Sequence, residues 1–141
     1  MEKLNKLLAD VTVLNNKVRG IHYNVCGIHF MDAHEFMEKE YDQLTEWIDE
    51  IAEGIKMKHV DPILSLKEML EITTIQELDL KEIKSCQSYK ILEEDYKKLL
   101  EEIKSIDKEQ ENAFIDDLLT EMEIYLNKKI WILESINKRI Q

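Results

Sequence analysis

Apolar side chains recur at intervals of three and four residues along four long segments, and this spacing constrains the fold more than any other feature. Side chains spaced in this way lie on one face of an α-helix, so each segment predicts an amphipathic helix. The chain has only 3 glycines and 1 proline among 141 residues, which also favours helices over strands. The predicted helices run over about 3–26, from 32 to before Pro62, 88–105, and from a capping segment at 107–110 to the last apolar positions near 140.

Capping residues indicate where these helices begin and end. Gly27 stands where a C-terminal cap of the first helix is expected, and Asp32 with Glu35 resembles a capping box that starts the second. Ser65 and Glu68 form a similar pattern, which predicts a short extra helix over 66–72 in the long connection between the second and third helices. Together these features predict one all-α domain over 1–141, a four-helix bundle with one crossover, which is the ferritin-like topology among others.

The apolar face of the last helix is predicted from the same spacing. We assign it Leu118, Met122, Tyr125, Ile132, Ile136 and Ile140.

The charge balance indicates which partners suit the surface. Acidic residues outnumber basic ones 30 to 19, giving a net charge of −11, so the surface repels phosphate backbones and attracts cations. Metal ions are therefore favoured over nucleic acid as partners. Cys26 and Cys86 lack CxxC spacing and are interpreted as reduced thiols, and no leader or membrane-spanning segment is expected, which predicts a cytoplasmic protein.

Five polar side chains lie at positions that suit metal coordination: His22, His34, Glu38, Asp49 and Glu53. The members of the pairs His34–Glu38 and Asp49–Glu53 are each four residues apart, which makes them neighbours on a helix face. A simpler interpretation competes with this one. Carboxylates four apart arise often by chance in so acidic a chain, and a single histidine at a helix edge is more often a packed boundary residue than a ligand.

The distance between the two pairs restricts any shared metal site. Glu38 and Asp49 are eleven residues apart, which returns to nearly the same helix face about 16 Å further along. One metal ion cannot span that distance, so if all five residues are ligands, two chains must share each site. An antiparallel pair of second helices would place Asp49 and Glu53 of one copy against His34 and Glu38 of the other, with His22 joining from the same chain as His34.

A di-iron site inside one bundle is the alternative in ferritin-like proteins, and it requires Glu-x-x-His motifs. None of the four histidines has a glutamate three residues earlier. The sequence therefore disfavours a site within one subunit.

Three segments of the chain resemble the Dps family, the miniferritins of the ferritin-like superfamily. The first is His22-Tyr23-Asn24-Val25-Cys26-Gly27 followed by Phe30, His34 and Glu38; the second is Asp49-Glu50-Ile51-Ala52-Glu53; the third is Asn127-Lys128-Lys129-Ile130-Trp131-Ile132-Leu133. The resemblance covers essentially the whole chain.

The resemblance implies a hollow shell of twelve subunits with ferroxidase sites at its two-fold interfaces. Each site would hold two irons between His22, His34 and Glu38 of one subunit and Asp49 and Glu53 of its dimer mate. It would oxidise Fe(II), preferably with hydrogen peroxide, and the ferric mineral would be stored inside. Tyr23 is a possible electron-transfer residue. Acids near the start of the last helix would line the pores that admit iron, here Asp107, Glu111 and Asp116.

Three departures from the family pattern bear on the site. Glu38 stands where Asp is usual, Tyr23 where Trp is frequent, and Gly54 where Arg is common; a mid-helix glycine is expected to loosen the second helix. Two other functions stay open: a non-catalytic helical assembly, and a nucleoid-associated, DNA-protecting protein. DNA binding is disfavoured by the charge and by the lack of a lysine-rich start. Imidazole and carboxylate ligands would also accept Zn or Mn.

Overall fold

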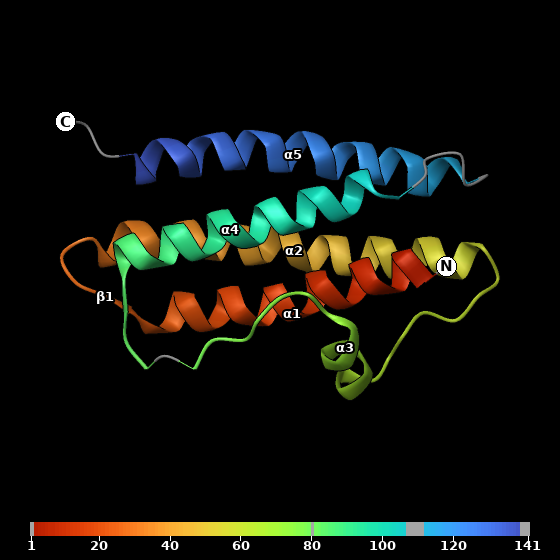
Figure 1. The fold of residues 1–141 in the computed structure, drawn as a ribbon, viewed down its shortest axis with the longest axis horizontal. Helices are drawn as coiled ribbons and strands as arrows, with labels where there is room; N and C mark the ends of the chain where they lie inside the picture. The colour runs from red at the N-terminus through yellow and green to blue at the C-terminus, as the bar shows by residue number, and fades with distance from the viewer. Residues whose placement is uncertain (1, 80, 107–111, 139–141) are drawn as a thin grey trace.

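Four long helices form an antiparallel bundle in the computed structural model, which describes residues 2–79, 81–106 and 112–138. In chain order the elements are α1 (Glu2–Asn24), β1 (Val25–Cys26), α2 (Phe30–Met57), α3 (Leu66–Ile72), β2 (Ile83–Lys84), α4 (Ser85–Lys104) and α5 (Ala113–Asn137). α1 packs mainly against α2, and α4 against α5. α2 and α4 run in the same direction, so the chain must cross the full length of the bundle between them (Figure 1). The predicted all-α bundle with a short helix in this crossover is confirmed.

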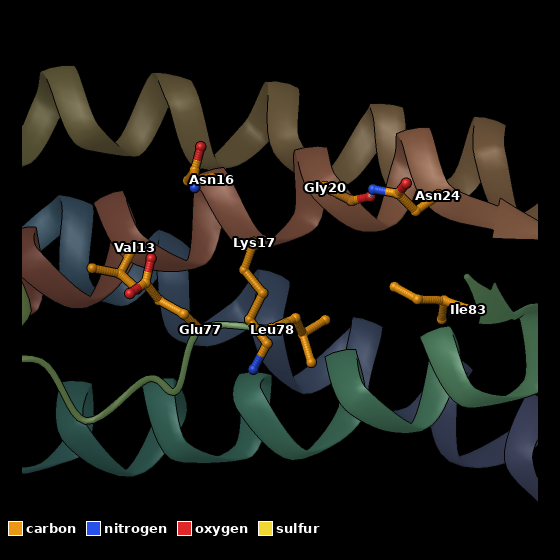
Figure 2. Close-up of a pocket in the computed structure, with 8 residues that line it drawn as sticks. All are labelled: Val13, Asn16, Lys17, Gly20, Asn24, Glu77, Leu78 and Ile83. Carbon is orange, nitrogen blue, oxygen red and sulfur yellow. Dashed lines mark hydrogen bonds between the residues drawn. The ribbon is translucent and has the colours of Figure 1, made fainter. Parts of the chain in front are cut away.

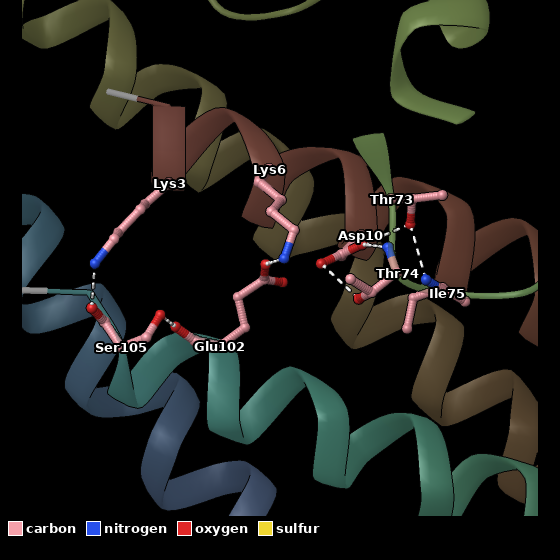
Figure 3. A network of polar contacts seen from close by, with 8 residues as sticks. All are labelled: Lys3, Lys6, Asp10, Thr73, Thr74, Ile75, Glu102 and Ser105. Carbon is pink, nitrogen blue, oxygen red and sulfur yellow. Dashed lines mark hydrogen bonds and ion pairs between the residues drawn. The ribbon is translucent and has the colours of Figure 1, made fainter. Parts of the chain in front are cut away.

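The crossover is held at three places, two on α1 and one on the short strand β1 that follows it. The Asn5 side chain accepts a hydrogen bond from the backbone N–H of Ile63 at 3.0 Å. Further along, the Asp10 carboxylate accepts hydrogen bonds from the segment that follows α3 (Figure 3). At the far end, β1 and β2 form a two-residue parallel ladder in which Val25 pairs with Ile83. The sequence did not predict this ladder, because two-residue strands have no periodicity.

Several predicted helix ends are wrong by a few residues. α1 ends at Asn24, and Gly27 lies beyond β1 in a turn, where its φ of 112° is one that glycine adopts readily. α2 begins at Phe30 after His29, whose side chain makes no capping hydrogen bond, so the capping box predicted at Asp32 is not the start of this helix.

The start of α3 was predicted correctly, whereas the starts of α4 and α5 differ from the prediction. The prediction for α3 is confirmed to the residue, with the Ser65 hydroxyl accepting from Glu68 N–H at 3.3 Å. α4 begins at Ser85, three residues before the predicted start. α5 is capped by Asn112, whose side chain accepts from two backbone N–H groups; the predicted capping segment 107–110 lies outside the described residues.

The core is formed by the apolar residues that recur every three or four positions in α1 and α4, as predicted, and in part by those of α2 and α5. On α5, the prediction is wrong beyond Tyr125: Ile136 is exposed, Ile132 is half-buried, and Ile140 lies outside the described residues. The buried side chains of that half are Leu126, Ile130 and Leu133. Apolar residues surround α5 on nearly every side, so more than one stripe fits its spacing. No helix in the described ranges is long and apolar enough to span a bilayer.

Gly54 has a packing role that the sequence did not reveal. It lies inside α2, where a β-carbon would come within 2.9 Å of Ile115 Cγ1 and 3.4 Å of Phe114 Cδ1. The first turn of α5 therefore approaches the α2 backbone more closely than any other residue would allow. Glycine at this position therefore permits a close contact between α2 and α5, and the expected loosening of α2 stays a prediction.

Candidate metal centre

His22 and His34 bind each other's backbones in a reciprocal arrangement. His22 lies in the last turn of α1 with 5% of its surface exposed, and His34 lies in the second turn of α2. The His22 Nδ1 is 2.7 Å from the His34 carbonyl oxygen, and the His34 Nδ1 is 2.8 Å from the His22 carbonyl oxygen. The two rings stack, with centroids 3.7 Å apart and planes 12° apart.

This arrangement determines which ring nitrogens are available to a ligand. A carbonyl oxygen can only accept a hydrogen bond, so the Nδ1 of each ring must carry a proton and donate it. In the neutral ring the lone pair then lies on Nε2, which is the nitrogen left for a metal ion. A backbone carbonyl at the second nitrogen is a common partner of metal-binding histidines, because it fixes both the tautomer and the ring orientation.

Glu38 lies beside these histidines. Its Oε1 is 3.9 Å from His22 Nε2, and its side chain is 54% exposed. Phe30 stacks on the outer side of His34 with ring centroids 4.8 Å apart. One half of the predicted ligand set therefore lies in one region at the surface of the bundle, with two stacked imidazoles and a carboxylate near the Nε2 of His22.

Four further side chains support this cluster, and we call Asn15, Arg19, Tyr41 and Thr45 the bracket. The Tyr41 ring meets the His22 ring edge-on, with centroids 5.3 Å apart. The Arg19 guanidinium lies over the face of the same tyrosine ring, 4.3 Å from its centroid. Sequence reasoning missed these residues, although Arg19 is three residues before His22 and Tyr41 three after Glu38, which places each on the same helix face as a candidate ligand.

Burial is the main cause that raises the pKa of the Tyr41 hydroxyl above its ordinary value. The charges of Glu38 and Asp42 raise it further, and Arg19 lowers it in part. Tyr41 therefore stays protonated at neutral pH.

Asp49 and Glu53 do not reach this cluster. Both are exposed on α2, and the helix rise places Asp49 about 16 Å from Glu38. Within the described residues, no three His, Cys, Asp or Glu side chains converge on one metal position. Nearby, burial and the charges of Glu121, Glu46 and Glu53 raise the pKa of Glu50. This part of α2 is a strongly acidic surface, which attracts cations.

The remaining predicted residues are Tyr23 and the three acids of the expected pore. Tyr23 is 67% exposed and meets His22 at a ring distance of 5.5 Å. Asp116 lies in the first turn of α5. Asp107 and Glu111 fall outside the described residues.

The bundle interior contains a buried carboxylate that is paired with a lysine. Glu40 is fully buried, and its Oε1 accepts hydrogen bonds from Tyr96 at 2.6 Å and Tyr125 at 2.9 Å. Its Oε2 lies 3.3 Å from the amine of Lys129. This network has no imidazole, and a lysine ammonium already balances its carboxylate, so its composition does not suit a metal ion.

A small surface pocket lies between α1 and the crossover. It has a volume of about 100 Å³ and is lined by residues that include Lys17, Glu77 and Ile83 (Figure 2). The Lys17 amine extends from α1 toward α4, where it forms an ion pair of 2.6 Å with Asp95. Both partners are buried, so this pair joins two helices and the Lys17 charge is already balanced.

The fold and the sequence both match known proteins. A family model described as a ferritin-like domain matches residues 1–141, which defines the class of the protein as ferritin-like. A DNA protection during starvation protein of Helicobacter pylori is 32% identical over 95% of each chain. DNA protection during starvation protein 2 of Bacillus anthracis is 35% identical over 96% of this chain and 94% of its own.

Solved structures agree with these matches. The crystal structure of antigen TpF1 from Treponema pallidum superposes with a TM-score of 0.93 at 29% identity, covering 98% of this chain and 90% of its own. That of a Dps protein from Bacillus brevis gives a TM-score of 0.89 at 28% identity, covering 96% and 93%. The chain belongs to the Dps family, the miniferritins of the ferritin-like class.

Proposed function

We propose that this miniferritin oxidises Fe(II) at sites shared between two copies of the chain and stores the ferric product inside a hollow shell. The observation that carries the proposal is that the candidate ligands form two incomplete groups, one at the start of α2 beside His22 of α1 and one further along α2. His22, His34 and Glu38 gather at one place, while Asp49 and Glu53 lie exposed on α2 about 16 Å further on. Neither group alone completes a two-metal site.

A two-fold axis between antiparallel α2 helices would complete both groups at once. Such an interface is self-complementary, so each dimer would carry two equivalent sites. Six such dimers would form the twelve-subunit shell that the family resemblance implies. We place the assembly in the cytoplasm, where both exposed cysteines would stay reduced.

The donor set suits iron as a substrate. Carboxylates accept both Fe(II) and Fe(III), and imidazole is a good ligand for either. Each of two Fe(II) ions gives one electron to hydrogen peroxide, the O–O bond breaks, and two protons complete two water molecules. A solved Dps structure from Vibrio cholerae is described as a member of the ferritin-like diiron-carboxylate proteins, which supports a two-iron site here. Another, from Listeria innocua, was soaked with zinc, so zinc is a competing cation to test.

Mixed assemblies test the shared site directly. His34→Ala and Glu53→Gln each remove a ligand from both sites of a uniform dimer, so each variant alone should lose fast peroxide-dependent Fe(II) oxidation. In a mixed dimer both defects fall in one site, and the other site is intact. Random mixing by co-expression should therefore recover about a quarter of the wild-type rate, because half of the dimers are mixed and each has one intact site of two.

Two other outcomes would contradict the proposal. A site within one subunit would stay defective in every mixture, so no recovery would contradict sharing. Wild-type rates in both single variants would contradict the ligand assignment and favour a non-catalytic helical assembly. His59→Ala is the matched control, because His59 is an exposed histidine beyond the end of α2. This variant should oxidise iron at the wild-type rate.

A further inference from the structure

We propose that Arg19 and Tyr41 are positioning residues of the iron site, which fix the ring of His22 so that its Nε2 faces the metal. The inference rests on the proposed function, and it identifies which side chains outside the ligand set determine how tightly the first metal is held. The contacts of the bracket residues with His22 and with one another support this inference.

The His22 ring needs support from outside its own residue. The torsion that rotates an imidazole about its Cβ–Cγ bond has a broad energy minimum, so the side chain alone does not define where Nε2 lies. The His34 carbonyl holds Nδ1, and the His34 ring covers one face of His22. The Tyr41 ring contacts His22 at 5.3 Å and 76° and closes a further direction in which the imidazole would otherwise rotate.

Tyr41 is in turn held by Arg19. The Arg19 Nε donates to Asn15 Oδ1 at 3.0 Å, and its Nη2 donates to Thr45 Oγ1 at 3.2 Å. These two bonds fix the guanidinium plane over the tyrosine ring. Arginine can stack and donate two directed hydrogen bonds at the same time, which a lysine ammonium cannot do.

The bracket also joins α1 to α2 beside the site. The Asn15 amide donates to the Tyr41 carbonyl oxygen at 2.8 Å and to Thr45 Oγ1 at 3.0 Å. His22 and Arg19 belong to α1, whereas His34, Glu38 and Tyr41 belong to α2. The bracket therefore sets the spacing of the two helices that each contribute ligands, and metal geometry depends on tenths of an ångström.

Cobalt(II) binding followed by visible absorption tests the inference, because Co(II) takes similar ligands to Fe(II) and its absorption bands report coordination geometry. Tyr41→Leu removes the ring and should weaken Co(II) affinity about 10- to 100-fold, the usual effect of losing a partner that orients a ligand. It should also change the intensities of the bands. Tyr41→Phe keeps the ring and should bind Co(II) as the wild type does. Arg19→Gln should weaken binding, and Arg19→Lys should not restore it.

A structural role alone would give a different pattern. It would lower the melting temperature of the Tyr41 and Arg19 variants and leave the Co(II) bands unchanged, which would overturn the proposal. Full rescue by Arg19→Lys would overturn it too, since charge rather than orientation would then be sufficient. Lys56→Gln, which removes an exposed cation elsewhere on α2, is the matched control and should leave Co(II) binding unchanged.

The same titration separates this inference from the proposed function. If His34→Ala leaves Co(II) binding unchanged, the site itself is wrongly assigned. If His34→Ala abolishes binding while every Arg19 and Tyr41 variant binds as the wild type does, only the positioning role fails.

Discussion

Glu102→Gln should make the protein more stable at alkaline pH and remove a dependence of stability on pH. Glu102 lies on α4 with 10% of its side chain exposed, between Lys6 and Asp10 of α1 (Figure 3). Burial first, and the nearby Asp10 second, raise the pKa of its carboxyl from 4.5 to about 7, against the opposing effect of Lys6 at 2.8 Å. The neutral carboxyl can lie near the Asp10 carboxylate without repulsion, whereas ionisation places two like charges together.

The size of the effect follows from the difference in pKa. Between pH 4.5 and about 7 the folded protein binds a proton on Glu102 that the unfolded chain has released. The free energy of unfolding therefore falls as pH rises through this window and is level above it. The shift corresponds to about 3 kcal/mol, since one pKa unit is about 1.4 kcal/mol. Glutamine cannot ionise, so the variant does not lose this stability.

Thermal unfolding at fixed protein concentration from pH 4.5 to 8.5 measures the effect. The difference in melting temperature between variant and wild type should grow with pH by roughly 10 °C, at about 3 °C per kcal/mol for a chain of this size. Glu101→Gln, at an exposed neighbouring glutamate, is the control and should follow the wild type. Parallel curves for Glu102→Gln and wild type over this range would refute the reasoning.

Three further substitutions test other parts of the structure. Gly54→Ala should lower stability by about 1–3 kcal/mol despite alanine's higher helix propensity, because its Cβ would meet Ile115; a more stable variant in urea unfolding would contradict this close contact. Lys129→Met should lower stability by about 3 kcal/mol or more, since it leaves Glu40 buried without its cation, and unchanged unfolding would show that the ion pair is dispensable. Asp116→Asn should slow iron uptake at low salt only, because salt screens the attraction; equal rates at all ionic strengths would argue against an acidic pore.

The sequence predicted the bundle well because each long helix carries a repeated apolar pattern. The stripes of α1 and α4 are buried as predicted, and the short α3 was located from the capping pattern at Ser65 alone. Prediction failed where the signal was weak or ambiguous. The β1–β2 ladder is too short to have a period, and α5 is apolar on nearly every side, so spacing alone selected the wrong stripe beyond Tyr125.

The sequence predicted only part of the candidate site, because contacts between two helices cannot be derived from the spacing within one. Helical spacing shows which residues share a face of one helix, and it grouped His34 with Glu38 and Asp49 with Glu53. It does not show which residues of two helices meet. The reciprocal His22–His34 hydrogen bonds and the Arg19–Tyr41 contact cross from α1 to α2. They depend on helix packing, which the spacing within either helix does not determine.

The interior of the bundle offers a reason why a metal site in this protein would lie at a subunit surface. Glu40 and Glu38 are two residues apart, so they lie on opposite sides of α2. The inward carboxylate is neutralised by the Lys129 amine and accepts hydrogen bonds from two tyrosine hydroxyls, and a divalent ion there would have to displace that ammonium from a fully buried carboxylate. The outward carboxylate pairs with no lysine or arginine among the described residues and lies beside an imidazole nitrogen. Two carboxylates on one helix thus have different environments, and only the outward one is free to bind a metal with a second copy of the chain.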